Sequence, residues 1–247
     1  MKGQYIIEIA TSDFSTTSAA VEGGADRIEL CANLAEGGTT PSYGLIRKCR
    51  ETFGISLYPI IRPRGGDFLY SEEEFEIIRQ DINICRDFGC DGIVIGMLDE
   101  DGGIDIHRTS KLIAAAYPLG VTYHRAFDRC RDPFEAMEQL IDLGCERILT
   151  SGQQPGAPEG VEFIAKLNKE ASQRIIIMPG SGVRAENIRM LAEKTGCIEF
   201  HSSLRGKHPS SMKFIHPAFA TSAESYSNNY IDPSEVRALK SILENKD

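Results

Sequence analysis

The sequence has no apolar run that approaches the roughly 20 residues a membrane-spanning helix requires. Its first ten residues, MKGQYIIEIA, enter a strand pattern at once, without the long apolar segment and cleavage site of a secretory signal peptide. Positive charge is scarce, because 27 lysines and arginines face 36 aspartates and glutamates, which gives a net charge of −9. These absences argue against a membrane, and against a nucleic acid, as the main partner.

Paired metal-binding motifs are missing as well. The sequence contains no C-x-x-C motif, no H-x-x-x-H motif and no methionine-rich tract. Its seven cysteines are an odd and widely scattered set, which suggests reduced thiols rather than a disulfide framework. We therefore expect a cytoplasmic protein.

Eight short runs rich in β-branched residues each end in polar residues or glycine, and each precedes a helical pattern. They span residues 5–10, 27–31, 56–63, 92–96, 120–127, 147–152, 174–182 and 197–203. Apolar strands that alternate with helices indicate a parallel sheet covered on its faces. Eight such units without a domain linker predict an α/β protein, a single TIM-like (β/α)8 barrel over residues 1–247. A doubly wound sheet is the alternative.

The helix-to-strand junctions also repeat. Glycine followed by a small residue stands at Gly24-Ala25, Gly89-Cys90, Gly144-Cys145 and Gly196-Cys197, where glycine suits a left-handed helix end. One connection is far longer than the others, at residues 204–233 between the eighth strand and the last helix. Such loops are usually lids, interfaces or disordered segments, and its composition does not decide among them.

Charged and titratable residues follow several of the predicted strands. Because side chains alternate along a strand, one face of the barrel mouth should collect Glu8, Glu29, Cys31, Arg62 and His124, with Asp128 just above. Barrel enzymes place their chemistry at this end, so the candidate catalytic residues are Glu8, Glu29, Arg62, His124 and Asp128. Arg125 should point the other way and pair with a helix. The alternative is a structural ion-pair layer of Glu8, Glu29 and Arg62 around a core histidine.

A second candidate site is the loop Met178-Pro179-Gly180-Ser181-Gly182-Val183, which leaves the seventh strand and enters a helix. In a barrel this position often binds phosphate through backbone N–H groups. The predicted anion-binding residues are Gly180, Ser181, Gly182, His201 and Ser202. The alternative is a glycine-rich turn needed only for packing. A dinucleotide fingerprint fits poorly, because no opening βαβ unit surrounds the loop.

Several of these segments together resemble the CutC family of copper homeostasis proteins. The resemblance rests on IEIATSDFSTTSAAVEGGADRIELCANLAEGGTTPSYGLI, PIIRPRGGDFLYS, VTYHRAFD, ILTSGQ and IMPGSGV, and it covers roughly residues 4–205 and the terminal helix. It implies a TIM-like barrel, a cytoplasmic location and a copper role through Cu(I) binding at cysteine. The family's Glu-Leu-Cys motif falls on Glu29, Leu30 and Cys31, so Cys31 is the candidate metal ligand.

Two functions of different kinds remain open. One is copper homeostasis, with a copper ion as partner and Cu(I) as the cofactor. The other is an enzyme acting on a small phosphorylated or anionic metabolite, with His124 or Glu29 as general acid or base, Arg62 holding the anion and the Gly180–Gly182 loop receiving phosphate. A structural scaffold that assembles through the long loop is a third possibility. We expect a homodimer, since closed symmetric dimers are the commonest oligomers.

Overall fold

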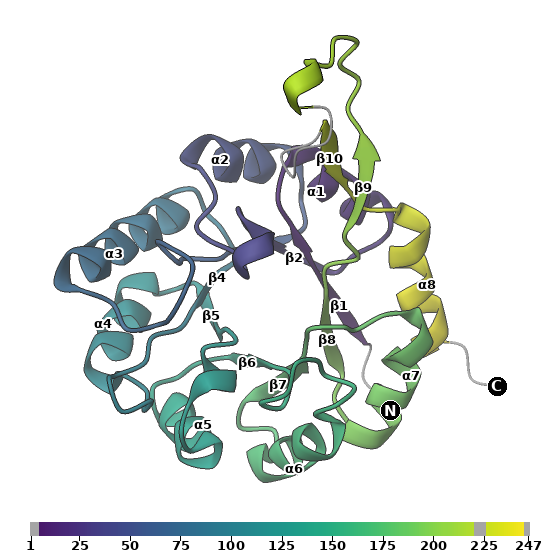
Figure 1. Ribbon diagram of the computed structural model, residues 1–247. Helices are drawn as coiled ribbons and strands as arrows, with labels where there is room; N and C mark the ends of the chain where they lie inside the picture. The colour runs from purple at the N-terminus through teal and green to yellow at the C-terminus, as the bar shows by residue number, and fades with distance from the viewer. Residues whose placement is uncertain (1–4, 220–225, 245–247) are drawn as a thin grey trace.

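Eight parallel strands form the centre of the computed structural model, which describes residues 5–219 and 226–244 (Figure 1). The strands are β1 (Ile6–Thr11), β2 (Arg27–Leu30), β3 (Ser56–Pro59), β4 (Gly92–Ile95), β5 (Gly120–Tyr123), β6 (Arg147–Thr150), β7 (Ile176–Pro179) and β8 (Glu199–Ser202). The helices around them are α1 (Phe14–Glu22), α2 (Tyr43–Thr52), α3 (Glu72–Asp87), α4 (Ile106–Ala116), α5 (Pro133–Asp142), α6 (Val161–Ala171), α7 (Ala185–Thr195) and α8 (Pro233–Glu244). The predicted (β/α)8 barrel is confirmed.

The barrel consists of two four-stranded sheets that meet edge to edge. One has the strand order β3-β2-β1-β8 and the other β4-β5-β6-β7. The first seam is closed by a parallel bridge between Ile60, just after β3, and Val94 of β4. At the second seam β7 lies beside β8 (Figure 1). Every strand pairing in the two sheets is parallel, which places all the strand carboxyl ends at one mouth.

The repeated glycine junctions behave as the sequence predicts. Gly24, Gly89, Gly144 and Gly196 have φ values of 84°, 68°, 82° and 68°, in the left-handed region that side chains disfavour. After three of them the next amide donates back into the preceding helix, as Cys90 does to the Cys85 carbonyl at 3.1 Å. These bonds satisfy carbonyls that a helix end would otherwise leave free, and they turn the chain directly into the next strand.

Strand alternation divides the core into two layers. One face of each strand packs apolar residues such as Ile7, Ile28 and Ile93 against the helices. The barrel interior holds a smaller apolar cluster of Cys31, Tyr58, Ile60 and Val94, together with many charged side chains. How those interior charges are paired with one another therefore decides which of them remain available to a ligand at the barrel mouth.

Ion pairs fill the amino-terminal half of the barrel interior. Arg27 bonds to Glu8 on one side and to Glu199, at 2.6 Å, on the other. Arg147 also reaches Glu199, at 2.7 Å, and Thr122, at 3.0 Å. Because each buried cation has a carboxylate partner, the cost of removing these charges from water is offset. This layer lies beneath the cavity described below, and Glu8 connects the two through His201.

The long connection at 204–233 carries structure of its own. It contains an antiparallel hairpin of β9 (Gly206–Pro209) and β10 (Ser227–Tyr230), which projects from the barrel beside α1 and α8 (Figure 1). A short 3-10 turn, η3 (Pro217–Phe219), lies between the two strands. Residues 220–225 of the connection fall outside the described residues. Across the described part of the chain, no helix is long and apolar enough to cross a membrane.

We expect Gly92→Ala to destabilise the fold by about 1–3 kcal/mol, because overpacking a full interior has that cost. A Cβ at position 92 would lie 2.1 Å from the Tyr58 ring, and that ring is held between the guanidinium groups of Arg27 and Arg147 at 5.3 and 5.5 Å. Gly44→Ala is the matched control, since a Cβ there meets nothing within 4 Å. Urea unfolding should show the loss only for Gly92→Ala, and equal stabilities would contradict the packing argument.

Candidate functional site

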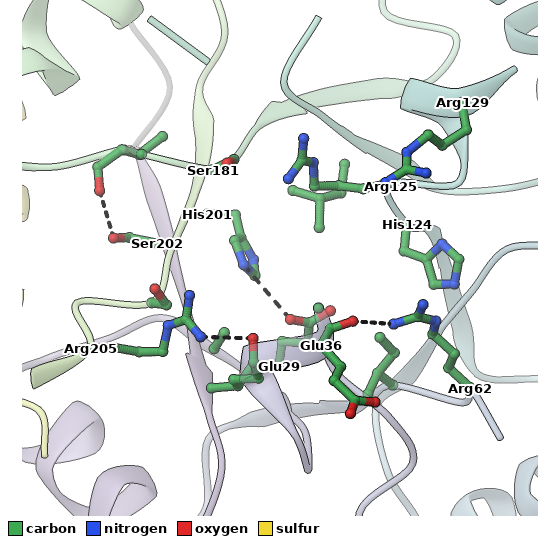
Figure 2. Close-up of a pocket in the computed structure, with 18 of the residues that line it drawn as sticks. Glu29, Glu36, Arg62, His124, Arg125, Arg129, Ser181, His201, Ser202 and Arg205 are labelled. Atoms are coloured by element: carbon green, nitrogen blue, oxygen red, sulfur yellow. Dashed lines mark hydrogen bonds and ion pairs between the residues drawn. The ribbon is translucent and has the colours of Figure 1, made fainter. Parts of the chain in front are cut away.

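A cavity of about 280 Å³ opens at the carboxyl ends of the strands. Its wall combines strand ends with the loops that follow them, including the short 3-10 turn η1 (Leu34–Glu36) after β2. The charged and titratable residues of the wall are Glu29, Glu36, Arg62, His124, Arg125, Arg129, Arg184, His201 and Arg205. Figure 2 shows most of them directed toward a common space. Five arginines and two glutamates give the wall an excess of positive charge.

Arg62 is the buried cation of the cavity. Only 4% of its surface is exposed, and its guanidinium donates to the main-chain carbonyls of Glu36, Gly38 and Gly66 at 2.8–2.9 Å. Its face lies 4.9 Å from the Phe68 ring centroid. Within the described part of the chain no carboxylate forms an ion pair with it. A buried cation without an opposite charge is costly, so a bound anion would complete the site.

The remaining arginines enter from loops. Arg129, Arg184 and Arg205 form no ion pair with any described carboxylate, although Arg205 donates to the Leu34 carbonyl at 2.7 Å. Arg125 bonds to Asp128 at 2.7 Å and to Ser151 at 2.7 Å. The prediction that Arg125 points away from the mouth is wrong, because β5 ends at Tyr123 and strand alternation does not continue into the turn.

The glycine-rich loop after β7 presents backbone N–H groups to the cavity. Ser181 and Gly182 have φ values of 71° and 74°, a left-handed turn that aims successive amides to one side. Ser181, Gly182 and Val183 line the cavity, and none of their amides donates to another described protein atom. Gly180, by contrast, is outside the wall and donates to the Thr150 carbonyl at 2.9 Å. The amides that remain free to bind an anion are therefore those of residues 181–183, one residue further along the chain than the predicted Gly180–Gly182.

The two predicted partners from β8 differ in what they offer. Ser202 donates its hydroxyl to the Val183 carbonyl at 2.7 Å, which fixes the loop against the strand. His201 Nδ1 lies 2.7 Å from Glu8 Oε1. On the other side of the ring, Nε2 lies 3.7 Å from Glu29 Oε2 (Figure 2). The imidazole is thus held between two carboxylates from neighbouring strands.

The charges around His201 set its protonation. Burial alone would lower the pKa of His201, but the carboxylates of Glu29 and Glu8 outweigh it and raise the pKa. Burial would raise the pKa of Glu8, yet Arg27 and His201 hold it far below its ordinary value. Glu29 has no arginine in contact, and burial raises its pKa. These shifts favour the ionised form of Glu8 and the protonated form of His201, and they make Glu29 bind a proton more readily than an ordinary glutamate.

His124 is in a different state. Burial and the nearby Arg62 lower its pKa to about 3, so the ring is neutral. Its Nδ1 accepts the Ala126 N–H at 3.1 Å. An acid–base role was predicted for His124, but a neutral ring with one nitrogen already occupied suits that role less well than His201 does.

Three other predicted residues lie away from the cavity wall. Glu8 is fully buried beneath it, within the ion-pair layer. Asp128 accepts from Thr150, Ser151 and Gln153 at 2.5–3.1 Å and thereby fixes the loop after β6. Cys31 is also fully buried, with its thiol 3.4 Å from Glu29 Oε2. Side-chain alternation predicts the face on which a residue lies but not its depth.

Metal ligation has little support in this geometry. Burial, followed by the Glu29 carboxylate, raises the pKa of the Cys31 thiol well above its ordinary range, which opposes the thiolate that a metal requires. The sulfur of Met178 already accepts from Arg27 at 3.3 Å. Among the described residues no group of three or more His, Cys, Asp or Glu side chains is placed to hold a metal ion. Cys31 with one carboxylate is a poor match to the soft ligands of Cu(I).

Glu36, Arg129, Arg184 and Arg205 were missed by strand alternation because they stand on loops. A usable signal did exist. Three of them are arginines that follow a strand end or a glycine-rich turn by a few residues. In a barrel such positions belong to the mouth.

The fold and the cavity define a (β/α)8 barrel protein with an arginine-rich site at the carboxyl ends of its strands. The particular family follows from comparison with known proteins. The CutC family matches residues 5–206, and the chain belongs to it.

Curated relatives align over nearly the whole chain. The family protein CutC of Chromobacterium violaceum is 48% identical over 242 residues, which cover 97% of this chain and 98% of the relative. The copper homeostasis protein cutC homolog of Homo sapiens is 43% identical over 245 residues, covering 98% of this chain and 90% of the relative. The predicted family membership is confirmed.

Solved structures agree at the level of the fold. The crystal structure of CutC from Streptococcus agalactiae is 34% identical, with a TM-score of 0.78 over 81% of this chain and 99% of that one. N-(5'-phosphoribosyl)anthranilate isomerase from Pyrococcus furiosus shares the fold alone, at 12% identity and a TM-score of 0.56 over 98% and 100% of the two chains.

We expect Glu29→Gln to lower the pKa of His201, because the substitution removes the carboxylate that raises it most. Since the folded pKa exceeds the ordinary 6.5, the ion pairs of His201 stabilise the fold fully below about pH 6.5 and are lost as pH rises through the folded pKa. The stability advantage of the wild type over Glu29→Gln should therefore shrink with rising pH. NMR titration of His201 and urea unfolding measure the two effects.

Glu36→Gln is the control, since Glu36 lies in the same wall but is not among the groups that shift His201. A His201 titration that is the same in wild type and Glu29→Gln would contradict the pairing.

Proposed function

We propose that this protein is an enzyme that acts on a small phosphorylated metabolite bound in the cavity. The observation that carries the proposal is Arg62, a buried guanidinium for which the described residues supply no carboxylate. An anionic ligand provides the missing charge, and bidentate guanidinium geometry suits phosphate.

The loop of Ser181 to Val183 supports the phosphate part of the proposal. Its three free amides stand at the start of α7, where the helix dipole favours negative charge. Arg184 extends the same wall with a further positive charge. Backbone amides and guanidinium groups together match a phosphate better than they match a metal cation.

Groups suited to proton transfer support the enzyme part. Glu29 and His201 lie 3.7 Å apart in the wall; burial raises the pKa of Glu29, whereas the carboxylates of Glu29 and Glu8 raise the pKa of His201. Perturbed titratable groups in a cavity are typical of catalytic sites. The same cavity therefore contains groups suited to binding an anion and groups suited to transferring a proton.

Crystals soaked in sulfate or phosphate should show an anion on the Ser181–Arg184 loop, and calorimetry with inorganic phosphate should give a measurable affinity. We expect Gly182→Asp to abolish this binding, because the carboxylate adds like charge where the backbone must approach the anion. Gly182→Asn is the matched control. Asn has nearly the same size and tolerates the left-handed φ of 74°, so binding should be weakened less.

Water alone at the loop in sulfate-soaked wild-type crystals, with no phosphate heat in solution, would remove the basis of this proposal. Equal phosphate affinity for Gly182→Asp and Gly182→Asn would place the anion elsewhere.

A second candidate function is Cu(I) binding at Cys31. It is favoured by relatives named copper homeostasis proteins and by the position of Cys31, whose thiol contacts a carboxylate of the cavity wall. A copper ion would have to displace the thiol proton against the raised pKa of that group. The geometry thus favours the anionic metabolite over copper.

If copper does bind at this site, Cys31→Ser should weaken Cu(I) affinity at least tenfold, about 1.4 kcal/mol. Cys90→Ser should not, because Cys90 lies at a helix-to-strand corner at the other end of the barrel. Competition with a Cu(I) chelator measures both affinities. An affinity that Cys31→Ser leaves unchanged would exclude Cys31 as the ligand.

A further inference from the structure

The nitrogen Nε2 of His124 is a buried polar atom without a partner. The residue is 4% exposed and lines the cavity, yet Nε2 meets no hydrogen-bonding atom among the described residues. The ring is fixed on its other sides. It packs 5.0 Å from the Phe68 ring, and glycine at position 96 makes room for it, since a Cβ there would lie 2.3 Å from Nδ1.

The identity of this nitrogen as a donor follows from its neighbours. Nδ1 accepts the Ala126 N–H, so in the neutral ring the proton is on Nε2. Arg62, the nearest charged group in the wall, is also only a donor and cannot satisfy it. Leaving a buried donor unpaired costs about 1–3 kcal/mol. An acceptor on the ligand would remove that cost.

The facing side of the cavity carries a carboxylate. In Figure 2, His124 and Arg62 stand together on one side, and His201 stands on the other, above Glu29. The position of Glu29 is set by β2, and His201 Nε2 lies 3.7 Å from its Oε2. Glu8 in turn orients His201 through Nδ1 at 2.7 Å. A ligand in the cavity therefore lies between a neutral N–H donor and a carboxylate.

We propose that the phosphorylated ligand carries a carbonyl group, whose oxygen accepts the His124 Nε2–H while Glu29 takes a proton from the carbon next to the carbonyl. The inference rests on the proposed function, because the phosphate on the Ser181–Arg184 loop holds the ligand in this position. In the step, the C–H bond breaks and its electron pair forms a C=C bond. The C=O π pair moves onto oxygen, and the proton passes to the carboxylate. Return of the proton to the same carbon gives back the starting compound. Where that carbon also carries a hydroxyl group, the hydroxyl proton moves to the former carbonyl oxygen, a new C=O bond forms at the hydroxyl-bearing carbon, and the proton on Glu29 returns to the former carbonyl carbon, which gives the isomer.

A neutral imidazole suits this step. Its N–H strengthens its hydrogen bond as negative charge develops on the oxygen, and it keeps its own proton throughout. Such a donor is worth most in a site shielded from water, and His124 is almost completely buried. Glu8 and His201 act as positioning residues for Glu29, since neither needs to touch the reacting carbon.

The test compares two phosphorylated probes of similar length. 2-Phosphoglycolohydroxamate is planar and carries oxygens placed like those of an enediolate, whereas glycerol 3-phosphate has only alcohol groups. By calorimetry we expect wild type to bind the hydroxamate at least tenfold more tightly than glycerol 3-phosphate. In His124→Phe and in Glu29→Gln that ratio should fall below threefold, because the two probes share the phosphate and only the hydroxamate uses these two side chains.

NMR of the wild type makes the test independent of how well the variants fold. The His124 Nε2–H proton should move downfield when the hydroxamate is added and should remain in place with glycerol 3-phosphate. His124→Gln, which retains an N–H donor, should recover part of the preference for the hydroxamate.

The outcomes separate this inference from the proposed function. If wild type binds both probes equally and the His124 proton does not move, the carbonyl inference is overturned while the anion site stands. If neither probe nor inorganic phosphate binds, the proposed function itself fails. A tenfold preference that survives His124→Phe would also overturn the role of His124.

Discussion

The carboxylate of Glu8 joins the structural interior of the barrel to its site. One of its oxygens accepts from Arg27 in the ion-pair layer, and the other meets His201 in the cavity. Because Glu8 is fully buried, both partners depend on its charge for compensation. Without it, Arg27 would lack one of its two carboxylates and His201 would lose its orientation toward Glu29. A change that destabilises the ion-pair layer at Glu8 therefore also changes the geometry of the cavity wall at His201.

Much of this arrangement can be predicted from the sequence because strand alternation is a local rule. It placed Glu29, Arg62 and His124 on the mouth-facing side, and the structure places all three in the wall. Beyond the strand ends the same rule holds for Arg62 and His124 but fails for Arg125. It also gives no depth, which is why Asp128 and Cys31 were expected to be available when their atoms are already engaged. Loop residues such as Arg184 follow no period, so their convergence requires the folded chain.

The family name and the cavity point to different chemistry. The human relative is named a copper homeostasis protein, and Cu(I) prefers soft sulfur ligands. The wall of this cavity instead combines guanidinium groups, free amides and a neutral imidazole, all of which donate hydrogen bonds. A shared name for a family describes a biological role, whereas the donor set describes what this particular space can hold. The family name and the donor set of the cavity wall are compatible only if the copper role does not require copper to be bound in this cavity.

The wall of the cavity is built from both sheets of the barrel and therefore spans the two seams between them. Arg62 and His201 belong to the half that contains β1, whereas His124 and the Ser181–Val183 loop belong to the half that contains β5. The first seam is closed by the bridge between Ile60 and Val94 and by backbone hydrogen bonds from Ile61 to Val94 and from Asp91 to Leu57. An anion in contact with both Arg62 and the Ser181–Val183 loop would link the two sheets across the seams. Occupancy of the mouth would then be coupled to closure of the two seams, because a ligand that contacts both sheets stabilises only the arrangement in which they meet.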